Sequence, residues 1–209
     1  MDSPDFKIIK PFGPSIVKVK IPNNIVNEMN KYVDKIISDE EKLKNLDHSG
    51  NLAGQVKQEF KLERDFMEKI KWGEFLGVNV GKWLFNETGK KLKSFDIKQS
   101  WIIRQFKDEY NPVHTHSGHV SGVGYLKVPE SFGISKPNKI NNKGCLNLIH
   151  GSINLFCKSQ YVVRPEVGDF YFFPNYLMHT VYPFTDTQEE RRSVSFNAKL
   201  DDEAANIFI

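Results

Sequence analysis

The chain has 209 residues, of which 39% are hydrophobic and 26% are charged, and its formal net charge is +3. This length suits one domain with a sizeable core, and 16 Phe, 7 Tyr and 3 Trp supply more buried surface than a disordered protein carries. No apolar stretch approaches the ~20 residues of a membrane span, and the start of the chain lacks the layout of a secretory signal. These features exclude a disordered or membrane-spanning protein and predict a soluble protein of the cytoplasm.

The two cysteines and the charge distribution narrow the class further. Cys145 and Cys157 cannot form a disulfide scaffold and lack metal-ligand spacing, so we interpret them as small core residues. The lysines are scattered along the chain and form no basic block with interleaved aromatic residues. Nucleic acid is therefore not indicated as a partner.

Up to about residue 94 the periodicity is mainly helical. Residues 16–21, where Ile and Val alternate with Ser and Lys, predict a short strand. Apolar residues at three- and four-residue spacing predict a helix that opens at Pro22 and a second helix over residues 64–87. Residues 47–58 between them are polar and contain glycine, which predicts a loop.

From residue 95 onward, short β-type runs are separated by Gly, Pro and Asn. The predicted strands are residues 99–106, 113–116, 120–128, 145–150, 152–156, 161–164, 169–173, 179–183 and 192–200. Many short strands at regular spacing favour a sandwich or a jelly roll, and the helices before them would cover one face. We expect an α+β fold and a single domain over residues 1–209, with residues 1–94 as helical support and 95–209 as the β core.

Three of the six histidines fall in one short segment, at His114, His116 and His119. Residues two apart in a strand project from the same face, so His114 and His116 can point at one metal ion. The best candidate for a third ligand is His179, which follows a predicted turn and strand much later in the chain. Three such ligands leave half of the coordination sphere open, as oxygen chemistry requires.

A second predicted element of the site follows His179. Arg191, Ser193 and Ser195 alternate along one predicted strand and therefore share a face. An Arg side chain offers a rigid fork of donors that matches a carboxylate, and a neighbouring hydroxyl can add a hydrogen bond. The pattern predicts a carboxylate clamp.

These residues together resemble the Fe(II)- and 2-oxoglutarate-dependent dioxygenases, especially the prolyl-4-hydroxylase-like branch and the small oxygenases common in bacteriophage genomes. The matching parts are His114-Thr-His116, His179, and Arg191 with Ser193, and the likeness spans about residues 99–200. The resemblance implies a double-stranded β-helix, Fe(II) and 2-oxoglutarate as cofactors, O2 as a further partner, and hydroxylation of a substrate with release of succinate and CO2. A phage origin would place the protein in the host cytoplasm.

Under this resemblance, Arg191 and Ser193 would bind the C5 carboxylate of 2-oxoglutarate, and Asn111 and Tyr125 could also reach the cosubstrate. The chain departs from the family pattern at His116, where most members have a carboxylate. His116 could be a variant ligand, His119 could replace it from the following turn, or the site could be weak or inactive. We favour His116, because its spacing places it where the acid would lie.

Two other functions compete with this interpretation. One is a cupin-like dioxygenase that uses three histidines but no 2-oxoglutarate, and the other is a non-enzymatic jelly-roll binding or assembly module. Specificity would reside in polar loops at residues 47–58 and 130–143. The residues of these loops do not identify the primary substrate, which could be a peptide or protein side chain or a small metabolite.

Overall fold

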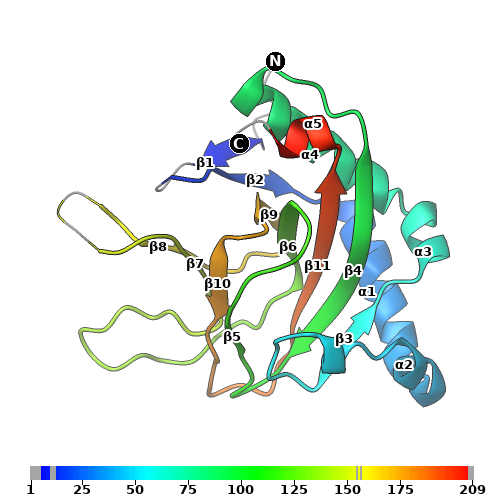
Figure 1. Cartoon of the computed structure of the whole chain (residues 1–209). Coiled ribbons are helices and arrows are strands. Elements are labelled where there is room, and N and C mark those ends of the chain that lie inside the picture. Colours follow the sequence, from blue (N-terminus) through cyan, green and yellow to red (C-terminus); the bar gives the residue numbers. More distant parts are fainter. Residues whose placement is uncertain (1–5, 10–12, 154, 156, 207–209) are drawn as a thin grey trace.

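The computed structural model of the chain describes residues 6–9, 13–153, 155 and 157–206. Its strands form two antiparallel sheets, a seven-stranded sheet in the order β1-β2-β9-β6-β11-β4-β3 and a four-stranded sheet in the order β5-β10-β7-β8. Helices cover the outer face of the larger sheet, and the smaller sheet lies on its other side (Figure 1). The α+β jelly roll with helical support is therefore confirmed.

The bounds of the elements are as follows. The larger sheet contains β1 (Lys7–Ile9), β2 (Ile16–Lys20), β3 (Gln58–Lys61), β4 (Phe95–Gln105), β6 (Val120–Lys127), β9 (Asp169–Pro174) and β11 (Arg191–Leu200). The smaller sheet contains β5 (Asn111–His114), β7 (Leu146–Ile149), β8 (Gln160–Val163) and β10 (Met178–Val181). The helices are α1 (Asn23–Ile37), α2 (Glu40–Leu46), α3 (Arg64–Lys69), α4 (Trp72–Thr88) and α5 (Asp202–Ala205), with a 3-10 turn, η1, at Ser49–Asn51. Among the residues described, no helix combines the length and apolar character that a bilayer crossing demands.

Strand β11 lies between the hydrophobic core and a polar cavity. Val194, Phe196 and other apolar residues of this strand pack in the core cluster beneath α1 and α4. The alternate residues Ser193, Ser195 and Asn197 line a cavity between the two sheets. Because successive side chains of a strand point to opposite faces, one strand supplies both the core and the polar wall.

The predicted second helix is divided in two. Lys71 lies between α3 and α4 with a positive φ of 57°, in the left-handed region that ends a regular helix. This break lets each helix find its own partner: the ring of Phe66 in α3 stacks on Tyr32 of α1 at 3.9 Å, and Trp72 of α4 is completely buried against Phe170 of β9. A single straight helix over residues 64–87 was therefore a wrong prediction.

Two strand predictions also need correction, and strands β1 and β3 were not predicted. The strand predicted at residues 113–116 is β5, which ends at His114 because His116 pairs with the turn after β9 instead. Ser152, Ile153 and Leu155 are not in a strand, and residues 154 and 156 of that predicted strand lie outside the described residues. Strand β3 was missed, since its first residue, Gln58, falls at the end of the predicted loop.

Candidate functional site

The structure brings His114, His116 and His179 together from three separate positions. His114 ends β5 and pairs directly with His179 of β10, so the two rings lie side by side with centroids 4.3 Å apart. His116 is held by two hydrogen bonds with Asn175, one donated by its backbone N–H and one accepted by its carbonyl oxygen. One potential ligand atom from each histidine lies within 4.8 Å of the others.

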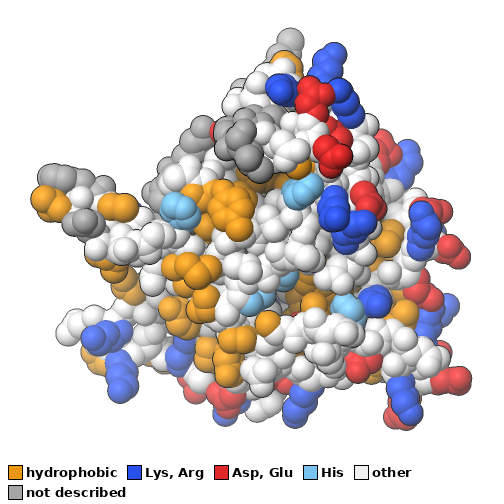
Figure 2. All heavy atoms as spheres, viewed as in Figure 1, with side chains coloured by type: hydrophobic (Ala, Val, Ile, Leu, Met, Phe, Trp, Pro, Cys, Tyr) orange, Lys and Arg blue, Asp and Glu red, His pale blue; other side chains and the backbone are white. Residues whose placement is uncertain are grey.

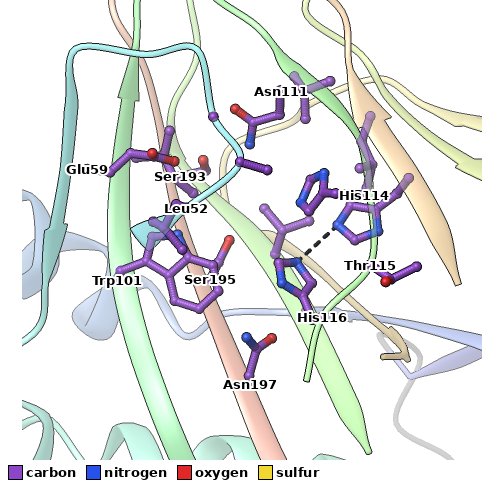
Figure 3. A pocket seen from close by; sticks show the side chains of 18 of the residues that line it. Leu52, Glu59, Trp101, Asn111, His114, Thr115, His116, Ser193, Ser195 and Asn197 are labelled. Carbon is purple, nitrogen blue, oxygen red and sulfur yellow. Dashed lines mark hydrogen bonds between the residues drawn. The ribbon is translucent and has the colours of Figure 1, made fainter. Parts of the chain in front are cut away.

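Hydrogen bonds to backbone carbonyls fix the tautomers of two of these rings. Nδ1 of His114 lies 2.7 Å from the carbonyl oxygen of Pro112, and Nδ1 of His179 lies 2.9 Å from that of Leu177. A carbonyl only accepts, so both Nδ1 atoms carry the proton and both Nε2 atoms keep a lone pair. Nε2 of His179 faces Nε2 of His116 at 3.1 Å, which is the dashed line in Figure 3.

The three imidazole rings of the cluster are uncharged at neutral pH. Burial is the main cause that lowers the pKa of His116 to about 3 and that of His179 to about 4, and nearby imidazoles add to both shifts. Burial also lowers the pKa of His114. The rings are therefore neutral at neutral pH, which is the form that binds a metal cation. Neutral nitrogen donors with fixed Nε2 lone pairs fit a transition metal such as Fe(II).

Arg191 is a buried cation that has no anionic partner among the described residues. Only 2% of its surface is exposed, and its Nη1 atom donates a hydrogen bond to Oε1 of Gln105 at 3.0 Å. Nε and Nη2 have no hydrogen-bond partner among the described residues, and burial lowers the pKa of the guanidinium. A charge buried in this way is costly unless an anion joins it, so the site fits a carboxylate ligand.

Two buried hydroxyl groups beside Arg191 also lack hydrogen-bond partners among the described residues. The guanidinium carbon lies 5.0 Å from the ring centre of Tyr125. The Tyr125 hydroxyl and the Ser193 hydroxyl are both buried and lack a hydrogen-bond partner among the described residues. An incoming carboxylate could accept hydrogen bonds from all of these groups, which fits the 2-oxoglutarate that the sequence predicts.

The three histidines, Arg191 and Ser193 line one cavity of about 300 Å³ between the sheets. The labelled histidines lie on one side of the hollow in Figure 3, and Trp101, Ser193 and Ser195 lie on the other. Asn111 lines the same cavity. On the face viewed in Figure 2, charged side chains gather along the helical side and the lower rim, whereas the centre carries histidine, apolar and uncharged side chains.

His119 is not part of the histidine cluster. Its Nδ1 atom accepts a hydrogen bond from the backbone N–H of Leu200 at 3.0 Å, and it borders a different pocket, near α4 and α5. His48 is buried between Gln99 and Asn51, which contact its two ring nitrogens. Neither residue reaches the cavity of the cluster.

Sequence reasoning missed Glu59, which lines the cavity from β3 and is 1% exposed. Burial is the main cause that raises the pKa of this carboxyl group to about 7, with contributions from Asp47 and Glu109. The alternation of Phe60 and Leu62 with polar neighbours was the available signal, because it indicates a strand whose other face includes Glu59.

The chain matches known proteins in both sequence and structure. Residues 99–197 match the family described as "Putative 2OG-Fe(II) oxygenase". No curated protein matches the sequence.

Three solved structures are similar in fold. A prolyl-4-hydroxylase from Pseudomonas putida aligns with a TM-score of 0.54 and 16% identity, covering 88% of this chain and 92% of its own. A viral collagen prolyl hydroxylase from Paramecium Bursaria Chlorella virus-1, in complex with 2-oxoglutarate, gives 0.53 and 12%, covering 88% and 94%. HygX from Streptomyces hygroscopicus, with nickel and 2-oxoglutarate bound, gives 0.55 and 11%, covering 90% and 82%.

At these sequence identities, the solved structures show only that the fold is shared. The similarity in sequence is the match of residues 99–197 to the family model. The matched residues include every histidine of the cluster as well as Arg191 and Ser193. Residues 99–197, somewhat less than half of the chain, are therefore similar in sequence to the 2OG-Fe(II) oxygenases, and the chain shares its fold with solved structures of such enzymes.

Proposed function

We propose that this protein is an Fe(II)- and 2-oxoglutarate-dependent dioxygenase that hydroxylates a primary substrate. In this proposal, residues 1–209 act as one domain, and His114, His116 and His179 hold the metal. The observation that carries the proposal is that three neutral imidazoles line the same cavity as a buried guanidinium whose Nε and Nη2 atoms have no hydrogen-bond partner among the described residues. The net reaction would convert the substrate, 2-oxoglutarate and O2 into the hydroxylated product, succinate and CO2.

The residues of this chain would bind and orient the cosubstrate. Arg191 and Ser193 would bind its C5 carboxylate, and the Tyr125 hydroxyl would add a hydrogen bond next to them. The guanidinium is already fixed by Gln105, so little side-chain freedom is lost on binding. Fe(II) held by the histidines would supply the redox chemistry that couples decarboxylation of 2-oxoglutarate to substrate oxidation.

His116 sets this site apart from the usual ligand set with one acid. A neutral imidazole in place of a carboxylate leaves one more positive charge at the metal centre, which strengthens the attraction for an anionic cosubstrate. A cupin-like enzyme without 2-oxoglutarate would also use three histidines. Arg191 favours the 2-oxoglutarate reaction, because its Nε and Nη2 atoms have no partner among the described residues and the cosubstrate would supply an anion there. The cupin-like alternative gives this buried cation no defined anion.

Ligand-induced stabilisation tests this proposal directly. We expect Mn(II) or Fe(II) to raise the melting temperature, and N-oxalylglycine to raise it further when the metal is present, because ligands that bind only the folded state stabilise it. Addition of 2-oxoglutarate with Fe(II) and O2 should release succinate and CO2. A protein that binds metal but shows no effect of either oxo acid would support the cupin-like alternative, and one that binds neither would support a non-enzymatic module.

Variants assign the residues. His179→Ala should abolish metal binding. Arg191→Met should keep metal affinity and lower the affinity for 2-oxoglutarate by roughly tenfold to a hundredfold, because charge-assisted hydrogen bonds are lost. His119→Gln is the matched control, since His119 lies outside the cluster. Equal metal affinity in the wild type and the His179 variant would overturn the ligand assignment.

A further inference from the structure

Glu59 faces the cavity from the opposite sheet to His114 and His179. It pairs with Ile103 of β4, and Ile103 pairs with Ser193 of β11, so the three residues form one row across the larger sheet. Two strand spacings separate Glu59 from Ser193, about 10 Å between their backbones. Figure 3 shows the Glu59 carboxyl group across the hollow from the labelled histidines.

The carboxyl group of Glu59 is buried and has no basic partner among the described residues. It is 1% exposed, and its Oε2 atom has no hydrogen-bond partner among the described residues. It forms no ion pair with any basic side chain in the part of the chain that the structure describes. Its charged neighbours are instead the acids Asp47 and Glu109. An acceptor buried in an excess of negative charge is stabilised by a group that brings donors and positive charge.

A second acceptor converges on the same point. A Cβ atom added to Gly54 would lie 2.7 and 2.8 Å from the two carboxyl oxygens of Glu59 and 2.9 Å from Oδ1 of Asn111. The three oxygen atoms therefore lie close together and pack against the α carbon of Gly54, in the loop that follows η1. Leu52, Ala53 and Gly54 of this loop line the cavity as well, so they form a wall beside these oxygens.

We propose that Glu59, with the side-chain carbonyl of Asn111, binds a protonated nitrogen of the primary substrate, an ammonium or guanidinium group. The identification of this ligand as the substrate rests on the proposed function. The cavity then has two chemically distinct ends: Arg191 receives the anionic cosubstrate, and Glu59 receives the cationic end of the molecule to be oxidised. Glu59 is not in the group of side chains that could hold the metal, so the carboxylate is free for this role.

Binding of model compounds tests the assignment without any turnover. The probes are Nα-acetyl-lysine methylamide and Nα-acetyl-arginine methylamide, and the neutral comparators are the corresponding norleucine and citrulline compounds. Ligand-observed NMR on the full chain, with and without Mn(II) and N-oxalylglycine, gives the dissociation constants. We expect a basic probe to bind the wild type at least tenfold more tightly than its neutral comparator, because charge-assisted hydrogen bonds are lost in the latter.

Two variants locate the binding. Glu59→Gln should weaken binding of the basic probe at least tenfold and leave binding of the neutral compound unchanged. Gly54→Ala should also weaken binding of the basic probe, because the added methyl group would push the oxygens of Glu59 and Asn111 out of position. Glu41→Gln on the exposed surface of α2 is the matched control. Equal affinity of the basic probes for the wild type and Glu59→Gln, or for basic and neutral probes, would overturn the assignment.

The outcome is separable from that of the proposed function. If metal and 2-oxoglutarate bind but no basic probe depends on Glu59, this inference is wrong and the oxygenase proposal stands. If a basic probe depends on Glu59 while metal and 2-oxoglutarate do not bind, the cation site stands and the oxygenase proposal is wrong.

Discussion

Arg191 and Arg192 are adjacent residues of β11, each 2% exposed, with opposite surroundings. Arg192 faces the helical side and bonds to carboxylate oxygens of Glu190 and Asp34, each at 2.7 Å. Arg191 faces the cavity, and the one hydrogen-bond partner of its guanidinium in the described part of the chain is the side-chain amide of Gln105. The paired guanidinium of Arg192 therefore stabilises the folded state, whereas the buried charge of Arg191 destabilises it as long as no anionic ligand is bound.

This contrast predicts different effects of one substitution on the free energy of unfolding. Arg192→Met should lower it by about 1–3 kcal/mol, because the buried carboxylate of Glu190 loses one of its two arginine partners and keeps only Arg104. Arg191→Met should change it by no more than about 1 kcal/mol in the ligand-free protein, because removal of the unpaired charge offsets the lost hydrogen bond. Urea denaturation of both variants measures the difference. Equal destabilisation would mean that Arg191 already has an anionic partner within the chain.

Glu59 makes the stability of the protein depend on pH. The pKa of its carboxyl group is about 7 in the folded chain, against an ordinary value of 4.5. Between these values the folded chain binds more protons than the unfolded chain, so this group lowers the free energy of unfolding as the pH rises from 4.5 to 7. The cost is fully present above pH 7 and absent below pH 4.5.

Glu59→Gln should therefore stabilise the protein at pH 8 by up to about 3 kcal/mol and have little effect at pH 4. Denaturant titrations of the wild type and the variant at both pH values give the two differences. Glu41→Gln should show neither. A gain of the same size at pH 4 and pH 8 would show that the charge of Glu59 is not the cause.

At the level of elements, β6 fits beneath the helices because Gly122 and Gly124, which lie between Val120 and Leu126 on that face, carry no side chain. A Cβ atom at Gly124 would lie 2.3 Å from the Phe170 ring and 2.8 Å from Ile21. Phe170 is completely buried and packs edge-on against Trp72 and Phe75 of α4. The glycine therefore sets the distance between the larger sheet and the helical layer.

Gly124→Ala should destabilise the protein by about 1–3 kcal/mol, as overpacking of a dense core does. Gly50→Ala is the control, because no heavy atom lies within 4 Å of the added Cβ and its φ is not in the left-handed region. Thermal or urea denaturation compares the two variants. A loss of stability at Gly50 as large as that at Gly124 would contradict the packing argument.

The sequence predicts elements whose pattern is local and misses features that depend on partners far along the chain. The apolar and polar alternation of β11 was sufficient to predict that Arg191 and Ser193 share a face. Strand period also brought His114 and His116 into one prediction, but it placed His116 in a strand. The structure positions His116 through Asn175, 59 residues later, and no local pattern encodes that contact.

Two further errors have the same origin. The break at Lys71 follows from the separate packing of Phe66 on α1 and Trp72 on β9, so the helical periodicity on either side does not reveal it. Glu59 lies in a four-residue strand whose pairing with β4 is needed to direct it into the cavity. Both features depend on tertiary contacts that override local propensity.

On the scale of the whole molecule, the proposed ligands divide between the two sheets. His114 and His179 belong to β5 and β10 of the smaller sheet, whereas Arg191 and Ser193 belong to β11 of the larger one. A metal ion alone would add contacts mainly to the smaller sheet and the segment of His116. A dicarboxylate held at one end by Arg191 and at the other by the metal would connect both sheets through the cavity.

Hydrogen exchange should therefore respond in two stages. We expect Zn(II), a redox-inert probe, to slow amide exchange in β5 and β10, and 2-oxoglutarate added with Zn(II) to slow it in β11 and β4 as well, because ligand binding suppresses local opening. Arg191→Met should keep the first stage and lose the second, and His179→Ala should lose both. If 2-oxoglutarate protects β11 equally in the wild type and Arg191→Met, the cosubstrate does not use this arginine to join the sheets.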